Sequence, residues 1–79
     1  MSEEERIREM VLEYFQIDES LLVPELSFDE LAVDSLTMLE LLTAIEEEFD
    51  IHLDDECFEA CENYGQMCEL IMERIRNRR

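Results

Sequence analysis

The scarcity of turn-forming residues is the feature that most restricts how this chain can fold. One Gly and one Pro occur among 79 residues, whereas β-hairpins and other tight turns depend on these residue types. Much of the chain consists instead of Glu, Leu, Met and Arg, which favour helices. The apolar fraction of 47% suits a globular chain with a packed core. We therefore expect residues 1–79 to form a single all-α domain.

Apolar residues recur with a helical period in three segments. They predict a first helix over about residues 3–15, a second from Asp34 or Ser35 to about Phe49, and a last helix that begins after Asn63. The expected apolar faces are Ile7, Met10, Val11, Tyr14 and Phe15; Leu36, Leu39, Leu42, Ile45 and Phe49, widened by Met38 and Leu41; and Tyr64, Met67, Cys68, Ile71 and Ile75.

The connections between these helices carry weaker signals. Asp54 or Asp55 can cap a short helix around Phe58. Ser27, followed three residues later by a glutamate, has the spacing of a capping box and predicts a turn of helix within the long first loop. Residues 49–54 alternate like a strand but have no partner strand, so we expect an extended linker there. The predicted fold is a small helical bundle of three longer helices plus one short helix, with a long first loop.

The charge distribution restricts the partners of the chain. Twenty-three Asp and Glu face six Arg and no Lys, which gives a net charge of −17. Between Glu9 and Glu73 there are 20 acidic residues and no Lys or Arg. Such a surface repels nucleic acid phosphates and anionic lipids, so we expect no nucleic acid and no membrane as partner. Near the C-terminus, four arginines are expected to complement the C-terminal dipole of the last helix: Arg74, Arg76, Arg78 and Arg79.

The cysteines indicate a reducing compartment. Cys57, Cys61 and Cys68 are odd in number and form no Cys-x-x-Cys pair, which argues against a disulfide framework. The acidic N-terminal residues do not resemble a signal peptide, and no apolar run exceeds three residues. We therefore expect a cytoplasmic protein. His52 with Cys57 and Cys61 lacks a fourth ligand and the spacing of a zinc site, so no metal is expected.

The segment Asp34-Ser35-Leu36 is the strongest candidate for a functional site. It stands where the long loop becomes the second helix. The unpaired N–H groups and the positive dipole of a helix N-terminus would stabilise a phosphate ester on the Ser35 hydroxyl. The alternative is that Asp34 or Ser35 is an ordinary N-cap.

A longer pattern surrounds this serine. Asp34-Ser35-Leu36, then Glu40-Leu41, then Ala-Ile-Glu-Glu-Glu-Phe-Asp-Ile over residues 44–51 resembles the acyl carrier protein family. The resemblance covers nearly the whole chain, including its length, acidity and long first loop. It implies that a phosphopantetheinyl transferase moves 4′-phosphopantetheine from coenzyme A onto Ser35, with Asp34 and Leu36 beside it. The resemblance further implies a non-catalytic, monomeric carrier of acyl thioesters for fatty acid or specialised polyketide-type biosynthesis.

The resemblance also implies which residues meet partner enzymes. Acyl-loading and synthase enzymes with basic docking patches would contact Leu36, Met38, Glu40, Glu46 and Glu47. A merely solvated helix face is the alternative for the three acids. The apolar residues expected in the core are Phe28, Leu39, Leu42, Ile45, Leu53, Ala60 and Ile71. The resemblance implies that some of them part to shelter an acyl chain.

Two other functions remain open at this stage. A peptidyl or aminoacyl carrier of nonribosomal synthesis usually has Gly-Gly before the serine region, where this chain has Ala32-Val33-Asp34. An acidic adaptor would bind basic partners without ever taking the prosthetic group. A Ser-His-Asp hydrolase is disfavoured, because 79 residues leave little room for an oxyanion hole and a substrate cleft.

Overall fold

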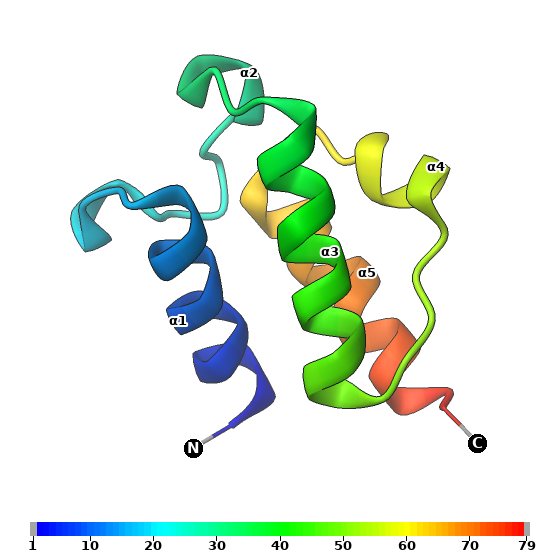
Figure 1. The fold of residues 1–79 in the computed structure, drawn as a ribbon. Helices are drawn as coiled ribbons and strands as arrows, with labels where there is room; N and C mark the ends of the chain where they lie inside the picture. Colours follow the sequence, from blue (N-terminus) through cyan, green and yellow to red (C-terminus); the bar gives the residue numbers. More distant parts are fainter. Residues whose placement is uncertain (1, 79) are drawn as a thin grey trace.

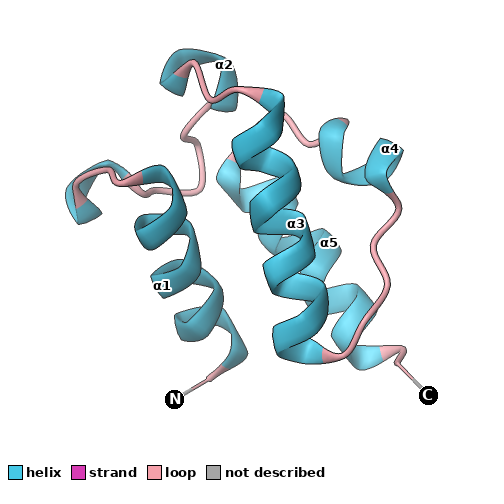
Figure 2. Ribbon diagram, viewed as in Figure 1, coloured by secondary structure: helices cyan, strands magenta, loops and turns pink. Residues whose placement is uncertain are grey.

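A computed structural model describes residues 2–78 and shows a bundle of helices (Figure 1). The elements within this range are α1 (Glu3–Phe15), the 3₁₀ helix η1 (Glu19–Leu21), α2 (Phe28–Leu31), α3 (Ser35–Phe49), α4 (Asp55–Glu59) and α5 (Tyr64–Arg76). Figure 2 shows helices joined by loops, with no strand in the part of the chain that is described. The predicted all-α bundle with three longer helices is therefore confirmed. Across residues 2–78, no helix is both long and apolar enough to cross a membrane.

Side-chain caps explain where the long helices begin. The Ser2 hydroxyl accepts the N–H of Glu5 at 3.2 Å before α1. The Asn63 side-chain oxygen accepts the N–H of Gln66 at 2.9 Å before α5. The Gln66 side chain in turn accepts the N–H of Glu62 at 2.8 Å, one residue earlier than in a standard capping box. Both helix starts lie where the sequence predicted them.

The short elements agree less closely with the sequence. α2 follows Ser27 as predicted, but the Ser27 side chain makes no cap hydrogen bond, so the expected capping box is wrong in that detail. η1 was not foreseen. It begins after Asp18, whose carboxylate accepts both the backbone N–H and the hydroxyl of Ser20 at 2.9 Å. Residues 51–54 form the expected irregular linker, and Asp54 caps α4 by accepting the N–H of Glu56 at 3.0 Å.

The core lies where α3 packs against α1 and α4, with α5 closing it from behind (Figure 1). Its buried side chains are Ile7, Met10, Val11, Leu22, Leu41, Leu42, Ile45, Phe49, Leu53, Phe58, Tyr64, Met67, Ile71 and Ile75. Four residues expected on apolar faces or in the core are exposed instead: Tyr14, Leu36, Leu39 and Ala60. Leu41, expected at the margin, is fully buried. Because α3 carries leucines around most of its circumference, periodicity alone could not say which side faces inward.

Close backbone contacts fix the long loop to the start of α5. The Gly65 N–H donates to the Pro24 carbonyl at 2.9 Å, and the Tyr64 N–H donates to the Leu26 carbonyl at 3.0 Å. A Cβ added to Gly65 would lie 3.1 Å from the Pro24 oxygen and 3.2 Å from its Cβ. The only glycine of the chain is therefore used where two backbones approach closely.

Arginines near the two ends of the chain hold the C-terminal end of α3. Arg78 donates to the carbonyl of Phe49, the last residue of α3, and Arg6 pairs with Glu48 at 3.2 Å. Arg74 and Arg76 lie in the last turn of α5 as predicted. Arg78 instead complements the dipole of a different helix, and Arg79 lies outside the described residues. Figure 1 shows the start of α1 and the end of α5 at the end of the bundle where α3 finishes.

Candidate functional site

Ser35 is the first residue of α3, and its side chain is exposed. Asp34 is the N-cap: its carboxylate accepts the N–H of Thr37 at 2.8 Å, and its carbonyl accepts the N–H of Met38 at 3.2 Å. The capping role that either residue could have taken therefore belongs to Asp34. The Ser35 hydroxyl is not needed to start the helix and stays accessible for chemistry.

The charge beside Ser35 is fixed by this cap. Donation from the backbone N–H of Thr37 holds the pKa of the Asp34 carboxyl below its usual range. Asp34 is therefore ionised at neutral pH, next to the hydroxyl. The N–H groups of Ser35 and Leu36 precede the first intrahelical hydrogen bonds, so they remain available to an anion at this helix end.

A hollow of about 420 Å³ opens beside Ser35. It lies between α2, the start of α3 and the segment that joins α4 to α5. The lining residues are Phe28, Asp29, Val33, Ser35, Met38, Glu59, Ala60, Cys61 and Glu62. Apolar side chains thus alternate with acidic ones around an exposed serine. A flexible arm esterified to Ser35 fits this arrangement, because its phosphate would meet the helix N-terminus while the rest could lie along the hollow.

Several residues of this hollow were missed by sequence reasoning. Glu59 and Glu62 are far from Ser35 in the sequence, and no local motif marks them as site residues. They reach the site because the Phe28 N–H donates to the Glu62 carbonyl at 3.2 Å, which ties α2 to the segment between α4 and α5. Cys61 was weighed in the sequence only as a free thiol and as a rejected zinc ligand; burial, with Cys57 nearby, raises its pKa. The only sequence hint was the grouping of Phe28 with Ala60 as possible shelter for an acyl chain.

The residues predicted to face partners divide into two groups. Leu36 has an exposed fraction of 66%, and Glu40 and Glu47 are also exposed on the same side of α3. Met38 is half-buried and points into the hollow beside Ser35. Leu36, Met38 and Glu40 lie close to the serine, whereas Glu47 lies on the same exposed side near the far end of α3.

Glu46 has a different environment. Its carboxylate accepts the N–H of Leu53 at 2.8 Å and lies 3.3 Å from Nδ1 of His52. The side chain is half-buried. Glu46 therefore holds the linker after α3 against that helix, a structural role which the sequence did not reveal.

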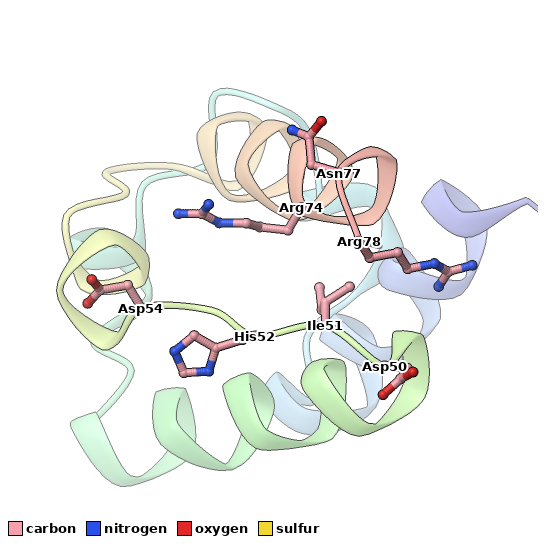
Figure 3. A pocket seen from close by; sticks show the side chains of 7 residues that line it. All are labelled: Asp50, Ile51, His52, Asp54, Arg74, Asn77 and Arg78. Atoms are coloured by element: carbon pink, nitrogen blue, oxygen red, sulfur yellow. The ribbon is translucent and has the colours of Figure 1, made fainter.

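A larger hollow, of about 830 Å³, lies at the opposite end of α3 from Ser35. Figure 3 shows Arg74 and Arg78 on one side of it, with Asp50, His52 and Asp54 on the linker across from them. The opposed charges give no consistent preference for an anion or a cation. Residues 2–78 contain no group of three His, Cys, Asp or Glu side chains placed to hold a metal ion.

Comparisons with known proteins decide the family. A family model described as a phosphopantetheine attachment site matches residues 5–71. An acyl carrier protein from Phenylobacterium zucineum (strain HLK1) is 39% identical over 72 residues, which cover 90% of this chain and 91% of that protein. The chain belongs to the acyl carrier protein family. Carriers of this family bear 4′-phosphopantetheine, so the predicted carrier function and cofactor are confirmed.

Membership in the acyl carrier protein family favours the carrier over the acidic adaptor. It is also consistent with a protein that holds substrates for other enzymes instead of transforming them. The hollow beside Ser35 and the exposed side of α3 are therefore candidate functional surfaces of a carrier.

Proposed function

We propose that Ser35 is the residue of this carrier that bears 4′-phosphopantetheine. The observation that carries the proposal is the exposed Ser35 hydroxyl at the first position of α3, with Asp34 already serving as the cap. The serine lies inside the matched range 5–71. The hollow along Phe28, Val33 and Met38 offers a surface to whatever is attached there.

The chemistry at Ser35 is the formation of one phosphate ester. The Ser35 oxygen bonds to the pantetheine-bearing phosphorus of coenzyme A and gives up its proton to a base on the transferase, while the pyrophosphate P–O bond breaks and adenosine 3′,5′-bisphosphate leaves. The N–H groups at the start of α3 favour the negative charge that accumulates there. When attached, 4′-phosphopantetheine supplies a terminal thiol that holds acyl groups as thioesters.

The proposed partners are a phosphopantetheinyl transferase and the acyl-loading and synthase enzymes of fatty acid or polyketide-type biosynthesis. Basic patches on these enzymes would meet Glu40 and Glu47, while Leu36 and Met38 supply apolar contact. The Glu46 carboxylate already accepts the N–H of Leu53, so it would contribute mainly to the negative electrostatic potential of the surface. We propose that the carrier acts as a monomer in the cytoplasm, in keeping with its three free cysteines.

Intact mass tests the attachment site. The apo-protein is incubated with coenzyme A and a transferase of broad specificity, and a gain of one phosphopantetheine unit is expected. Ser35→Ala should abolish the gain, since no hydroxyl remains at the helix start. Ser20→Ala, which removes an exposed hydroxyl from η1, should leave the gain intact. Modification that persists in Ser35→Ala would refute the assignment.

A further inference from the structure

Exposed apolar side chains gather where α1 and α3 lie side by side (Figure 1). Tyr14 on α1 has an exposed fraction of 37%, and Leu39 on α3 has an exposed fraction of 41%. Both were expected on buried helix faces. Neither belongs to the core, although the core of a chain of 79 residues has few apolar side chains to spare. Their exposure therefore needs another explanation.

The two side chains belong to one groove. A hollow of about 360 Å³ is lined by Tyr14, Leu39, Glu40, Thr43, Ala44 and Glu47. A second hollow, of about 310 Å³, shares Tyr14, Ala44 and Glu47 and continues along α1. The floor is formed by the small side chains Thr43 and Ala44. An apolar side chain of another molecule can enter between the Tyr14 ring and Leu39.

The rim of this groove is acidic. Glu13 lines the second hollow, while Glu40 and Glu47 line the first. No ion pair involving these three carboxylates is found between residues 2 and 78, whereas Glu48 at the far end is paired with Arg6 at 3.2 Å. The groove thus combines an apolar slot with uncompensated negative charge. A second copy of the chain is a poor occupant, because two molecules of net charge −17 repel one another.

We propose that the groove between α1 and α3 receives an apolar side chain flanked by Lys or Arg on the docking surface of a partner enzyme, with Tyr14 and Leu39 as its walls. The inference rests on the proposed carrier function and extends it, because it adds α1 to the docking surface. Leu39 and Glu40 lie one turn after Ser35, so a partner seated here stands beside the attachment site. Tyr14 becomes a residue that distinguishes between partners by the shape of the inserted side chain.

A peptide titration tests the groove without the prosthetic group. The probe is a short synthetic peptide with one central leucine flanked by arginine and lysine, added to isotope-labelled apo-protein and followed by amide NMR. The largest shifts are expected around Tyr14, Leu39 and Ala44. A matched peptide with glycine in place of leucine should bind more weakly and shift acidic residues diffusely. Equal shift patterns for the two peptides would overturn the proposal.

Variants separate the groove from general charge attraction. Tyr14→Ala and Leu39→Ala should each weaken binding of the leucine peptide about fivefold or more, as expected when an aromatic or apolar contact at an interface is removed. Leu21→Ala, which truncates an exposed apolar residue on η1, is the control and should bind like the parent. Unchanged affinity in both groove variants would refute the groove. Loading of the parent protein at Ser35 is followed separately by intact mass, so failure of the carrier assignment would be distinguishable from failure of the groove.

Discussion

The two sides of α3 have opposite environments. On one side, Leu36 and Leu39 are exposed near Ser35. On the other side, Leu41, Ile45 and Phe49 are buried, and the helix end is held by Arg78. One helix therefore contributes one side to the core and leaves the other side open to other molecules.

The difference shows that burial in this small domain is not simply maximised. The exposed leucines Leu36 and Leu39 contribute little to folding and lie next to Ser35, where we propose that other enzymes dock. The buried side fixes the helix against the rest of the bundle. Substitutions that treat the two sides differently test this division, from the largest expected effect to the smallest.

Leu41→Ala should destabilise the domain by about 2–5 kcal/mol, because it removes a fully buried side chain and leaves a cavity. Leu39→Ala, the same chemical change two residues earlier, should cost no more than about 1 kcal/mol because Leu39 is already partly in water. Urea unfolding followed by circular dichroism measures both. Equal losses would contradict the division of α3 into a core side and a docking side.

Glu46→Gln should destabilise the folded state by about 1 kcal/mol, since the charged acceptor of the Leu53 N–H becomes a neutral amide oxygen in a half-buried place. Hydrogen exchange of the Leu53 amide should accelerate. Glu47→Gln is the matched control. Because the Glu47 carboxylate is exposed, its replacement should change the free energy of unfolding by no more than about 0.5 kcal/mol. For partner-dependent loading the order should reverse, with Glu47→Gln the more harmful. A larger stability loss in Glu47→Gln would count against the structural role of Glu46.

Ala32→Gly should stabilise the domain by about 1 kcal/mol. Ala32 ends α2 with a φ of 52°, in the left-handed region that costs a residue with a Cβ and suits glycine. The corresponding residue at the far end of α3 is Asp50, with a φ of 53°. Because Asp tolerates this conformation better than Ala does, Asp50→Gly should gain less. A lower urea midpoint for Ala32→Gly than for the parent would mean that chain flexibility outweighs the relief of strain.

The smallest expected effect is on how the stability of the domain depends on pH. Since the folded-state pKa of Asp34 is lowered, its contribution to stability is present above the unfolded value near 4 and is lost as pH falls through the folded value. Asp34→Asn keeps a capping side chain but no titrating charge. Its urea midpoint should therefore fall less than that of the parent between neutral and acidic pH. Asp18, whose pKa is lowered by Ser20, contributes in the same direction and serves as an independent comparison through Asp18→Asn.

Local signals in the sequence were enough to place the long helices and the serine. The starts of α1, α3 and α5 follow from polar caps next to periodic apolar residues, and Asp34 and Asn63 both cap as their side-chain chemistry predicts. Ser35 could be singled out as the candidate attachment site because its motif, its position at a helix start and the acidic helix after it are all local features.

Contacts between distant segments could not be predicted in this way. Leu39 and Leu41 are chemically alike, and only packing against α1 and the other helices decides which is buried. Glu46 and Glu47 are adjacent carboxylates, but only Glu46 meets the linker when it folds back. The hollow beside Ser35 depends on the bond from Phe28 to Glu62, for which no spacing rule exists.

The placement of the start of α1 and the end of α5 at the same end of the bundle affects how this domain can be connected to other molecules. α1 begins and α5 ends where α3 finishes, far from Ser35 (Figure 1). A tether joined at either end, whether a surface anchor or a neighbouring domain, would leave the molecule from the pole opposite the serine. The carrier could then be immobilised or built into a larger assembly while its loaded face swings freely on the connecting segment.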